Sequence, residues 1–329
     1  MPRRRRRIIS NQVYEICFRA REGLPLVCYD FMKLIINSVL ARTQRDNKVI
    51  LCHDIWNGSH PHLIVVAKDS EQFVQFYSEV QKKITDIIKR LLGLDHLSIW
   101  EGYPSVIEIA GVDEAISRIA YLYANPAQDN LEESIEKFPG CSSYREFRKL
   151  ENKLDASISK KCPWIRLPSV KKLKRTILTK AEDRKLVLRL RNKNRKQHLL
   201  VRRPNAWMSA FGISDDTEVK VNNDKMLELL HHLEREAAKL REFDKKPVMG
   251  AKKLQEQSLM KPHKPKKKSV KVFIYCHCNK LRKEAIKAFD DFCDKCRRCY
   301  LEWKRGNFNV EWPPGAFKPP LPPNCNVLA

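Results

Sequence analysis

The alternation of strand and helix patterns over the first 125 residues constrains the fold more than any other feature of the chain. Apolar side chains alternate over residues 13–20, and further strand patterns occupy 49–56, 60–67 and 106–109. The pair Asn57-Gly58 is a strong hairpin signal between two of these strands. Four consecutive aliphatic residues at 63–66 favour a central strand that is covered on both faces.

Three helices are expected between and after these strands. Apolar residues recur at helical spacing over 31–40 and 73–91, and the second helix is capped by Asp69 or Ser70 and stopped by Gly93. The third helix is expected over 113–124, where Asn125-Pro126 ends it. The order strand, helix, strand, strand, helix, strand, helix predicts an α+β fold: a ferredoxin-like antiparallel sheet (βαββαβ) plus an extra helix.

The rest of the chain is expected to be basic and mostly helical. Residues 160–203 hold 17 Lys or Arg and only two acids. Helices are expected at 225–243 and 280–304, with a Lys/Pro linker at 262–271 and a Pro-rich tail at 312–323. We therefore expect a first domain at 1–150, a basic extension at 151–261, and a linker, helix and tail at 262–329.

The charge balance favours a polyanionic partner. The chain has 64 Lys or Arg against 39 acids, a net charge of +25, which favours nucleic acid first and an anionic membrane second. Trp164 or Trp207 is expected to stack on an unpaired base. The residues expected to bind DNA are Arg3, Arg4, Arg5, Lys171, Lys172, Lys174, Arg175, Arg189, Arg191, Lys193, Arg195 and Lys196. The alternatives are a solvated charged helix face and, for the arginines near residue 1, a disordered tail.

No apolar run approaches the roughly 18 residues of a membrane span, and no signal-peptide core follows the first arginines. We therefore expect a cytoplasmic, nucleoid-associated protein with no membrane partner, whose 11 cysteines are mostly reduced. Cys276-His277-Cys278 and the group Cys293, Cys296 and Cys299 suggest a zinc site, but the spacing between the two groups misses the usual paired C-x-x-C form. Cys293 and Cys296 instead share a helical stripe with Ile286, Phe289 and Tyr300, which favours small buried side chains.

His60-Pro61-His62 is the first candidate for chemistry. Residues i and i+2 of a strand point to one face, so the two imidazoles are expected side by side, where they suit a divalent metal if a third ligand arrives from elsewhere. Alone, the H-x-H pattern is weak. Tyr121 is the second candidate, because it lies outside the apolar stripe of its helix and shares a face with Asn125. Tyr123 lies within the stripe and is expected to pack in the core.

Three ordered motifs resemble one enzyme family. The stretches 57–65 (NGSHPHLIV), 100–103 (WEGY) and 121–126 (YLYANP) are similar to those of the single-tyrosine HUH transposases, and among these to the REP-associated tyrosine transposases. The opening Met1-Pro2-Arg3-Arg4-Arg5 is also similar, and the resemblance covers roughly residues 1–150. Two positions depart from the family pattern: Pro61, where a larger apolar residue is usual, and Ser59, where Asn is usual.

The resemblance implies a metal-dependent reaction on single-stranded DNA beside a hairpin. His60, His62 and Asn125 would hold Mg²⁺ or Mn²⁺, which polarises the scissile phosphate. Tyr121 would form a 5′-phosphotyrosine and release a 3′-hydroxyl, so that rejoining needs no nucleotide cofactor. The protein would act as a monomer or a homodimer.

Other classes remain open. Plasmid relaxases and rolling-circle initiators share these motifs but usually carry further ligands and a helicase domain. An inactive hairpin-binding regulator on the same fold is the main alternative to an enzyme. An RNA-binding protein that uses the sheet is less favoured, since the first and third strands lack exposed paired aromatic residues.

Overall fold

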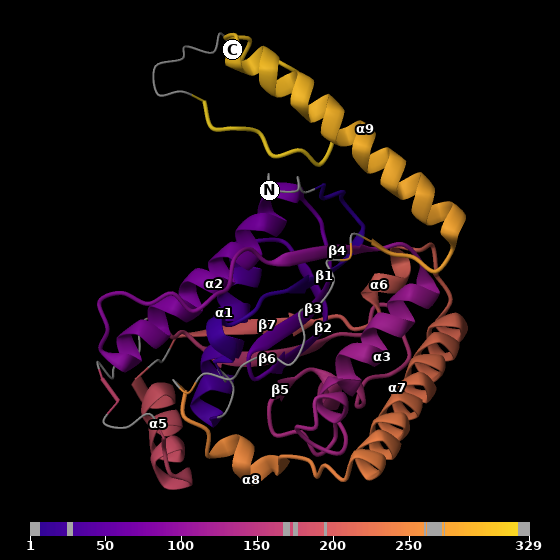
Figure 1. Ribbon diagram of the computed structural model, residues 1–329. Helices are drawn as coiled ribbons and strands as arrows, with labels where there is room; N and C mark the ends of the chain where they lie inside the picture. Colours follow the sequence, from indigo (N-terminus) through magenta and orange to yellow (C-terminus); the bar gives the residue numbers. More distant parts are fainter. Residues whose placement is uncertain are drawn as a thin grey trace.

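The centre of the protein is a mixed sheet of six strands in the order β5-β2-β3-β1-β4-β8 (Figure 1). The computed structural model describes residues 7–24, 29–166, 172–173, 177–193, 196–259, 261, 272 and 274–321. The strands of this sheet are β1 (Val13–Cys17), β2 (Ile50–Asn57), β3 (His60–Val66), β4 (Ser105–Ile109), β5 (Cys141–Ser142) and β8 (Ile274–Tyr275). Neighbouring strands are antiparallel except β4 and β8, which are parallel.

Helices cover both faces of this sheet. On one face lie α1 (Asp30–Asp46) and α2 (Ser70–Leu92); on the other, α3 (Val112–Gln128) runs beside α7 (Asp216–Asp244) (Figure 1). Strand alternation divides the core accordingly, because Tyr14 and Ile16 pack with α1 and α2 while Val13 packs with α3. Residue 15, between Tyr14 and Ile16, therefore belongs to the face that α3 covers.

A second, two-stranded antiparallel sheet pairs β6 (Ile158–Pro163) with β7 (Gln197–Arg202). The remaining helices are α4 (Tyr144–Phe147), α5 (Lys180–Lys193), α6 (Ala206–Ser209), α8 (Gly250–Gln255), α9 (Asn279–Lys304) and a 3-10 turn at Arg21–Gly23. Within the described ranges, no helix combines the length and apolarity that a membrane span requires.

The predicted strands and helices of the first 125 residues are confirmed as elements. β3 lies between β1 and β2, as its aliphatic run predicted, and the β2–β3 hairpin turns at Asn57-Gly58. Asp69 caps α2, since its carboxylate accepts a hydrogen bond from the backbone of Gln72 at 2.8 Å. Gly93 ends α2 with a left-handed φ of 66°.

Four predictions need correction. β1 ends at Cys17 rather than at residue 20, and the sheet is mixed rather than antiparallel because β8 joins its edge in parallel. The C-terminal region is helical but also contains β6 and β7, which are short strands within a strongly basic segment. Helix α7 begins at Asp216, well before the predicted 225, where the side chain of Asp215 caps it. The linker predicted at 262–271 lies outside the described residues.

Packing crosses the predicted boundary between the first domain and the basic extension. Ile165 and Leu190 of the basic extension belong to the core that α1 and α2 cover. Trp207 and Met226 belong to the core on the other face, with α3. The extension therefore completes both faces of the sheet, while the boundaries themselves stay a prediction.

Arg202 on β7 is a buried cation that joins the extension to the central sheet. Its guanidinium donates to both carboxylate oxygens of Asp54 on β2, at 2.6 and 3.1 Å, and to Glu146 at 2.6 Å. Burial alone would lower the pKa of Arg202, but the two carboxylates raise it overall. Asp54 is fully buried, so it depends on this cation for neutralisation.

We predict that Arg202→Met lowers the free energy of unfolding by about 3–5 kcal/mol, because it leaves the Asp54 charge buried and unpaired. Urea denaturation followed by circular dichroism measures this. As the control, Arg189→Met on the exposed side of α5 should cost less than about 0.5 kcal/mol. A loss below about 1 kcal/mol in Arg202→Met would show that this ion pair does not hold the extension in place.

Candidate functional site

The two predicted metal-binding histidines lie side by side at the start of β3. Their ring centroids are 5.1 Å apart and the rings are nearly perpendicular, at 79°. The His60 side chain is 27% exposed and that of His62 is 11% exposed. Pro61 is tolerated here because the β1–β3 ladder ends at the pair Cys17–His62, so Pro61 lies beyond it and pairs only with β2.

A buried carboxylate organises the neighbourhood of His62. Glu15 on β1 is 1% exposed, and its Oε1 lies 2.6 Å from Nδ1 of His62. Arg118 on α3 donates to both oxygens of the same carboxylate at 2.8 to 3.1 Å. A carboxylate so deeply buried is compensated only by such close cationic partners. Glu15 therefore joins β1, β3 and α3 at one point.

The shifts in pKa at this cluster have opposite signs. Burial would raise the pKa of Glu15, but its bonds with His62 and Arg118 hold it at about 2. Burial would lower the pKa of His62, but its interactions with Cys17 and Glu15 raise it to about 10. Burial and the repulsion of His62 and Arg19 lower the pKa of His60 to about 3. Near neutral pH, His62 is thus cationic and His60 is neutral.

The predicted nucleophile Tyr121 is linked to this cluster through Arg118. The guanidinium carbon of Arg118 lies 4.5 Å from the ring centroid of Tyr121 and 4.1 Å from that of Tyr275 on β8. Tyr121 is 37% exposed. Burial raises the pKa of the Tyr121 phenol, and the charge of Arg118 opposes that effect. Tyr121 and His62 are therefore connected by two intervening side chains, Arg118 and Glu15.

Asn125 is buried rather than exposed beside Tyr121, and the helix does not end there. Helix α3 continues through Pro126 to Gln128, which corrects the predicted end at residue 124. Pro126 has no backbone N–H for the carbonyl of Leu122, four residues before it. The Asn125 side chain supplies a replacement, because its Nδ2 donates to the Leu122 carbonyl at 3.3 Å. The amide oxygen of Asn125 is the atom that would bind a metal.

The outer hydrogen bonds of His60 and His62 are of the kind that metal-binding histidines make. Nδ1 of His60 lies 3.2 Å from the hydroxyl of Ser59, and Nδ1 of His62 is held by Glu15. Such outer bonds are typical of metal-binding histidines, whose other nitrogen binds the ion. Within the described ranges, no three His, Cys, Asp or Glu side chains gather into a metal site, so an ion here would also need the Asn125 oxygen or oxygens of a bound nucleic acid. The ligand set stays a prediction.

Sequence reasoning missed three residues of this cluster. Glu15 was detectable as an acid inside a strand with apolar neighbours, where a carboxylate needs a partner. Arg118 was detectable because it lies one helical turn before Tyr121, on the same side of α3. Tyr275 had no local pattern that connected it with residues more than 150 positions earlier.

Trp164 is the centre of a cationic surface on α1 and the small sheet. Arg42, Arg45 and Lys196 lie 5.2, 4.8 and 5.1 Å from the Trp164 ring, and the His198 ring is 4.2 Å away. Burial and the charges of Arg45 and Lys196 lower the pKa of His198. Such an excess of positive charge around a half-buried indole suits a polynucleotide backbone.

The other predicted DNA-binding residues are only partly described. Lys172, Arg189, Arg191 and Lys196 are exposed. Trp207 is 1% exposed and packs against Phe211, so the prediction that it stacks on a base is wrong. The structure does not describe the side chains of the remaining predicted DNA-binding residues, which are Arg3, Arg4, Arg5, Lys171, Lys174, Arg175, Lys193 and Arg195.

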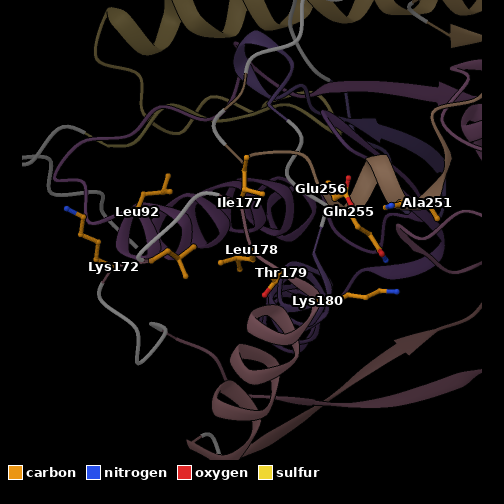
Figure 2. A pocket seen from close by; sticks show the side chains of 11 residues that line it. Leu92, Lys172, Ile177, Leu178, Thr179, Lys180, Ala251, Gln255 and Glu256 are labelled. Carbon is orange, nitrogen blue, oxygen red and sulfur yellow. The ribbon is translucent and has the colours of Figure 1, made fainter.

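A cavity of about 1230 Å³ lies away from these residues, between the end of α2, residues 172–173 and 177–180, and α8 (Figure 2). Its lining is mostly apolar with lysines around it: Leu92, Leu173, Ile177, Leu178, Lys172, Lys180 and Lys252 among others. Of the predicted site residues that the structure describes, only Lys172 lines it. The candidate chemistry is therefore not in this cavity.

The cysteines of α9 follow the sequence prediction only in part. Cys296 is buried with Phe289, but Ile286 and Tyr300 of the predicted stripe are 41% and 38% exposed. The buried face is instead completed by Phe292. Among the described cysteines, Cys17, Cys52, Cys141, Cys162, Cys276, Cys278 and Cys299 are free thiols.

Comparisons with known proteins give a distant likeness. No protein-family model matches the chain, and no curated protein matches it in sequence. Among solved structures, the chain is similar to a REP-associated tyrosine transposase bound to a REP hairpin, with 18% identity, 45% of this chain and 87% of that chain covered, and a TM-score of 0.39. At that TM-score, the chemistry of the site rests on the residues themselves.

We predict a pH-dependent loss of stability from the Glu15–His62 pair in metal-free buffer. The raised pKa of His62 makes its contribution complete below about pH 6.5 and lost as the pH rises toward 10. The lowered pKa of Glu15 makes its contribution complete above about pH 4.5 and lost as the pH falls toward 2. The unfolding free energy should therefore decline from pH 6.5 to 10, measured by urea denaturation with a chelator present. An equally steep decline in Glu15→Gln would contradict this assignment.

We also predict that the Trp164 surface binds single-stranded DNA through phosphate contacts. Arg45→Ala and Lys196→Ala should each reduce the slope of log binding constant against log salt by about 0.7, because each removes one phosphate contact. Fluorescence anisotropy with a labelled oligonucleotide at several salt concentrations measures the slope. Lys239→Ala, on exposed α7, is the control that should leave it unchanged. Unchanged slopes in both test variants would place DNA elsewhere.

Proposed function

We propose that this protein is a metal-dependent enzyme that cuts and rejoins single-stranded DNA through Tyr121. The observation that carries the proposal is the buried cluster of Glu15, His62 and Arg118, which connects a predicted metal ligand with the predicted nucleophile. Burying three ionisable groups together is costly for stability, and strongly shifted pKa values gather at functional sites. The resemblance of the three motifs to single-tyrosine HUH transposases supports the same function.

The strand order supports the finer fold that this function needs. Strands β2, β3, β1 and β4 are adjacent in that order and antiparallel, and α1 and α2 pack on one face of them. That is the arrangement of a ferredoxin-like βαββαβ unit. We infer such a unit at the centre of the six-stranded sheet, with β5 and β8 added at its edges.

In the proposed reaction, the phenol oxygen of Tyr121 attacks the scissile phosphorus and forms a 5′-phosphotyrosine, while the departing oxygen becomes a 3′-hydroxyl. The positive charge of Arg118 over the ring favours loss of the phenol proton. Attack by a 3′-hydroxyl on the phosphotyrosine reverses the step and rejoins DNA without a nucleotide cofactor. Mg²⁺ or Mn²⁺ held by His60, His62 and Asn125 would supply Lewis-acid activation of the phosphate.

The proposed substrate is single-stranded DNA beside a hairpin. The net charge of +25 and the cations around Trp164 support a nucleic-acid partner. The hairpin comes from the motif resemblance, and the transposase in the comparison was solved with a REP hairpin. We propose a cytoplasmic, nucleoid-associated protein that acts as a monomer or a homodimer.

One observation favours a second function, a hairpin-binding regulator without catalysis. The raised pKa of His62 favours its protonated form near neutral pH, in which neither ring nitrogen has a lone pair for a metal. An ion would have to displace that proton, which lowers metal affinity at neutral and acidic pH. A regulator would keep the DNA-binding surface and form no covalent product.

We predict that the protein forms a covalent DNA adduct with Mn²⁺ and a labelled single-stranded hairpin library, seen as a protein-linked 5′ product on a denaturing gel. Tyr121→Phe should abolish the adduct, because it removes the attacking oxygen. His62→Ala should reduce it by at least about 100-fold, through loss of a metal ligand and its support.

Tyr300→Phe is the matched control, since Tyr300 on α9 is 38% exposed, much as Tyr121 is, and lies outside both the cluster and the three motifs. Its adduct yield should equal that of the unaltered protein. Tight DNA binding with no adduct in either Mg²⁺ or Mn²⁺ would reject the enzyme and leave the regulator.

A further inference from the structure

The C-terminal segment reaches the candidate site through β8. Ile109 of β4 pairs with Tyr275, and the N–H of Ala110 donates to the Tyr275 carbonyl at 3.1 Å. Two residues later, the backbone N–H of His277 donates to the Glu114 carboxylate at 2.8 Å. These bonds fix the backbone on both sides of the Tyr275 side chain, at the sheet edge next to α3.

The Tyr275 side chain contacts Arg118 of the buried cluster. Its ring centroid is 4.1 Å from the guanidinium carbon of Arg118, which also lies 4.5 Å from the Tyr121 ring. The Tyr275 phenol is also close enough to Glu15 for the charge of that carboxylate to raise the pKa of the phenol. Arg118 is thus held by the Glu15 carboxylate through its nitrogens and by two phenol rings around its charge.

This arrangement restricts a side chain that is otherwise flexible. Arginine has several rotatable bonds, and fixing them has a substantial entropic cost. Cation–π contacts with two rings and paired bonds to a carboxylate select one position. Without the Tyr275 ring, Arg118 would keep its bonds to Glu15 but lose a contact that sets where its charge lies relative to Tyr121.

Tyr275 itself is less suited than Tyr121 to attack a phosphate. Burial and the charge of Glu15 raise the pKa of the Tyr275 phenol, so it stays protonated. Tyr121, which is 37% exposed, has greater access to a bound strand. The two tyrosines therefore differ in role although they share Arg118.

We infer that Tyr275 is a positioning residue of the candidate active site, supplied by the C-terminal segment, which holds Arg118 over Tyr121. The inference rests on the proposed function. It assigns to residues 274–275 a role that lies outside the region of family resemblance. The site is then complete only when β8 is paired with β4.

The first test compares Tyr275→Leu, Tyr275→Phe and the control Tyr300→Leu on α9. Tyr275→Leu should lower the maximal rate of adduct formation about 30- to 100-fold with KM changed less than about threefold, since misplaced groups slow the chemical step. Tyr275→Phe keeps the ring and should recover to within about tenfold of the unaltered rate. Tyr300→Leu, near the C-terminal end of α9, should leave the rate unchanged. Equal rates in Tyr275→Leu and the unaltered protein would overturn the inference.

A second measurement does not depend on activity. 3-Fluorotyrosine placed at Tyr121 gives a ¹⁹F resonance that reports the charge over its ring. Tyr275→Leu should shift this resonance and Tyr300→Leu should not, at matched melting temperatures. An unshifted resonance in Tyr275→Leu overturns the inference even if adducts form. A shift in a protein that forms no adduct supports the positioning contact and rejects the proposed function separately.

Discussion

The buried charge of Glu15 is the constraint on which the candidate site depends. A carboxylate that is 1% exposed within a central strand is stable only with close cationic partners. His62 and Arg118 satisfy this requirement from β3 and α3, and Tyr275 on β8 adds a cation–π contact with Arg118. Elements that are far apart in the chain therefore meet at one carboxylate. Two of these elements, β3 and α3, also carry His60 and Tyr121, the proposed metal ligand and the proposed nucleophile.

A second buried ion pair holds the basic extension against the central sheet. Arg202 from the basic extension neutralises Asp54 within the central sheet, and both are almost fully buried. The two pairs lie on β1 and β2, on either side of the strand that carries the histidines. Each pair makes a distant segment necessary for the sheet: β7 in one case and α3 in the other. The cations around Trp164 are consequently carried by α1 and by an extension that is packed into the core, rather than by a loosely attached arm.

The sequence predicted the elements well and the charged contacts poorly, for physical reasons. The alternation at β1, the aliphatic run of β3 and the caps at Asp69 and Gly93 are local patterns, and local patterns determine local structure. The partners of Glu15 are set by tertiary packing, so no short window contains them. The sequence predicted that α3 ends before Asn125-Pro126. The Asn125 side chain instead replaces the bond that Pro126 cannot make, and α3 continues. The prediction that Trp207 stacks on a base failed because a tryptophan next to a basic region is equally suited to the core, and Trp207 lies in the core.

The most direct test of the account is to identify the residue that carries DNA. After reaction with Mn²⁺ and a hairpin oligonucleotide, the adduct is digested with nuclease and protease, and the modified peptide is sequenced by tandem mass spectrometry. The account predicts a nucleotide remnant on Tyr121, with none on the neighbouring Tyr123, whose hydroxyl is buried against His53 and Ser143. A remnant on Tyr123 or Tyr275, or no remnant from protein that binds the same oligonucleotide tightly, would contradict it.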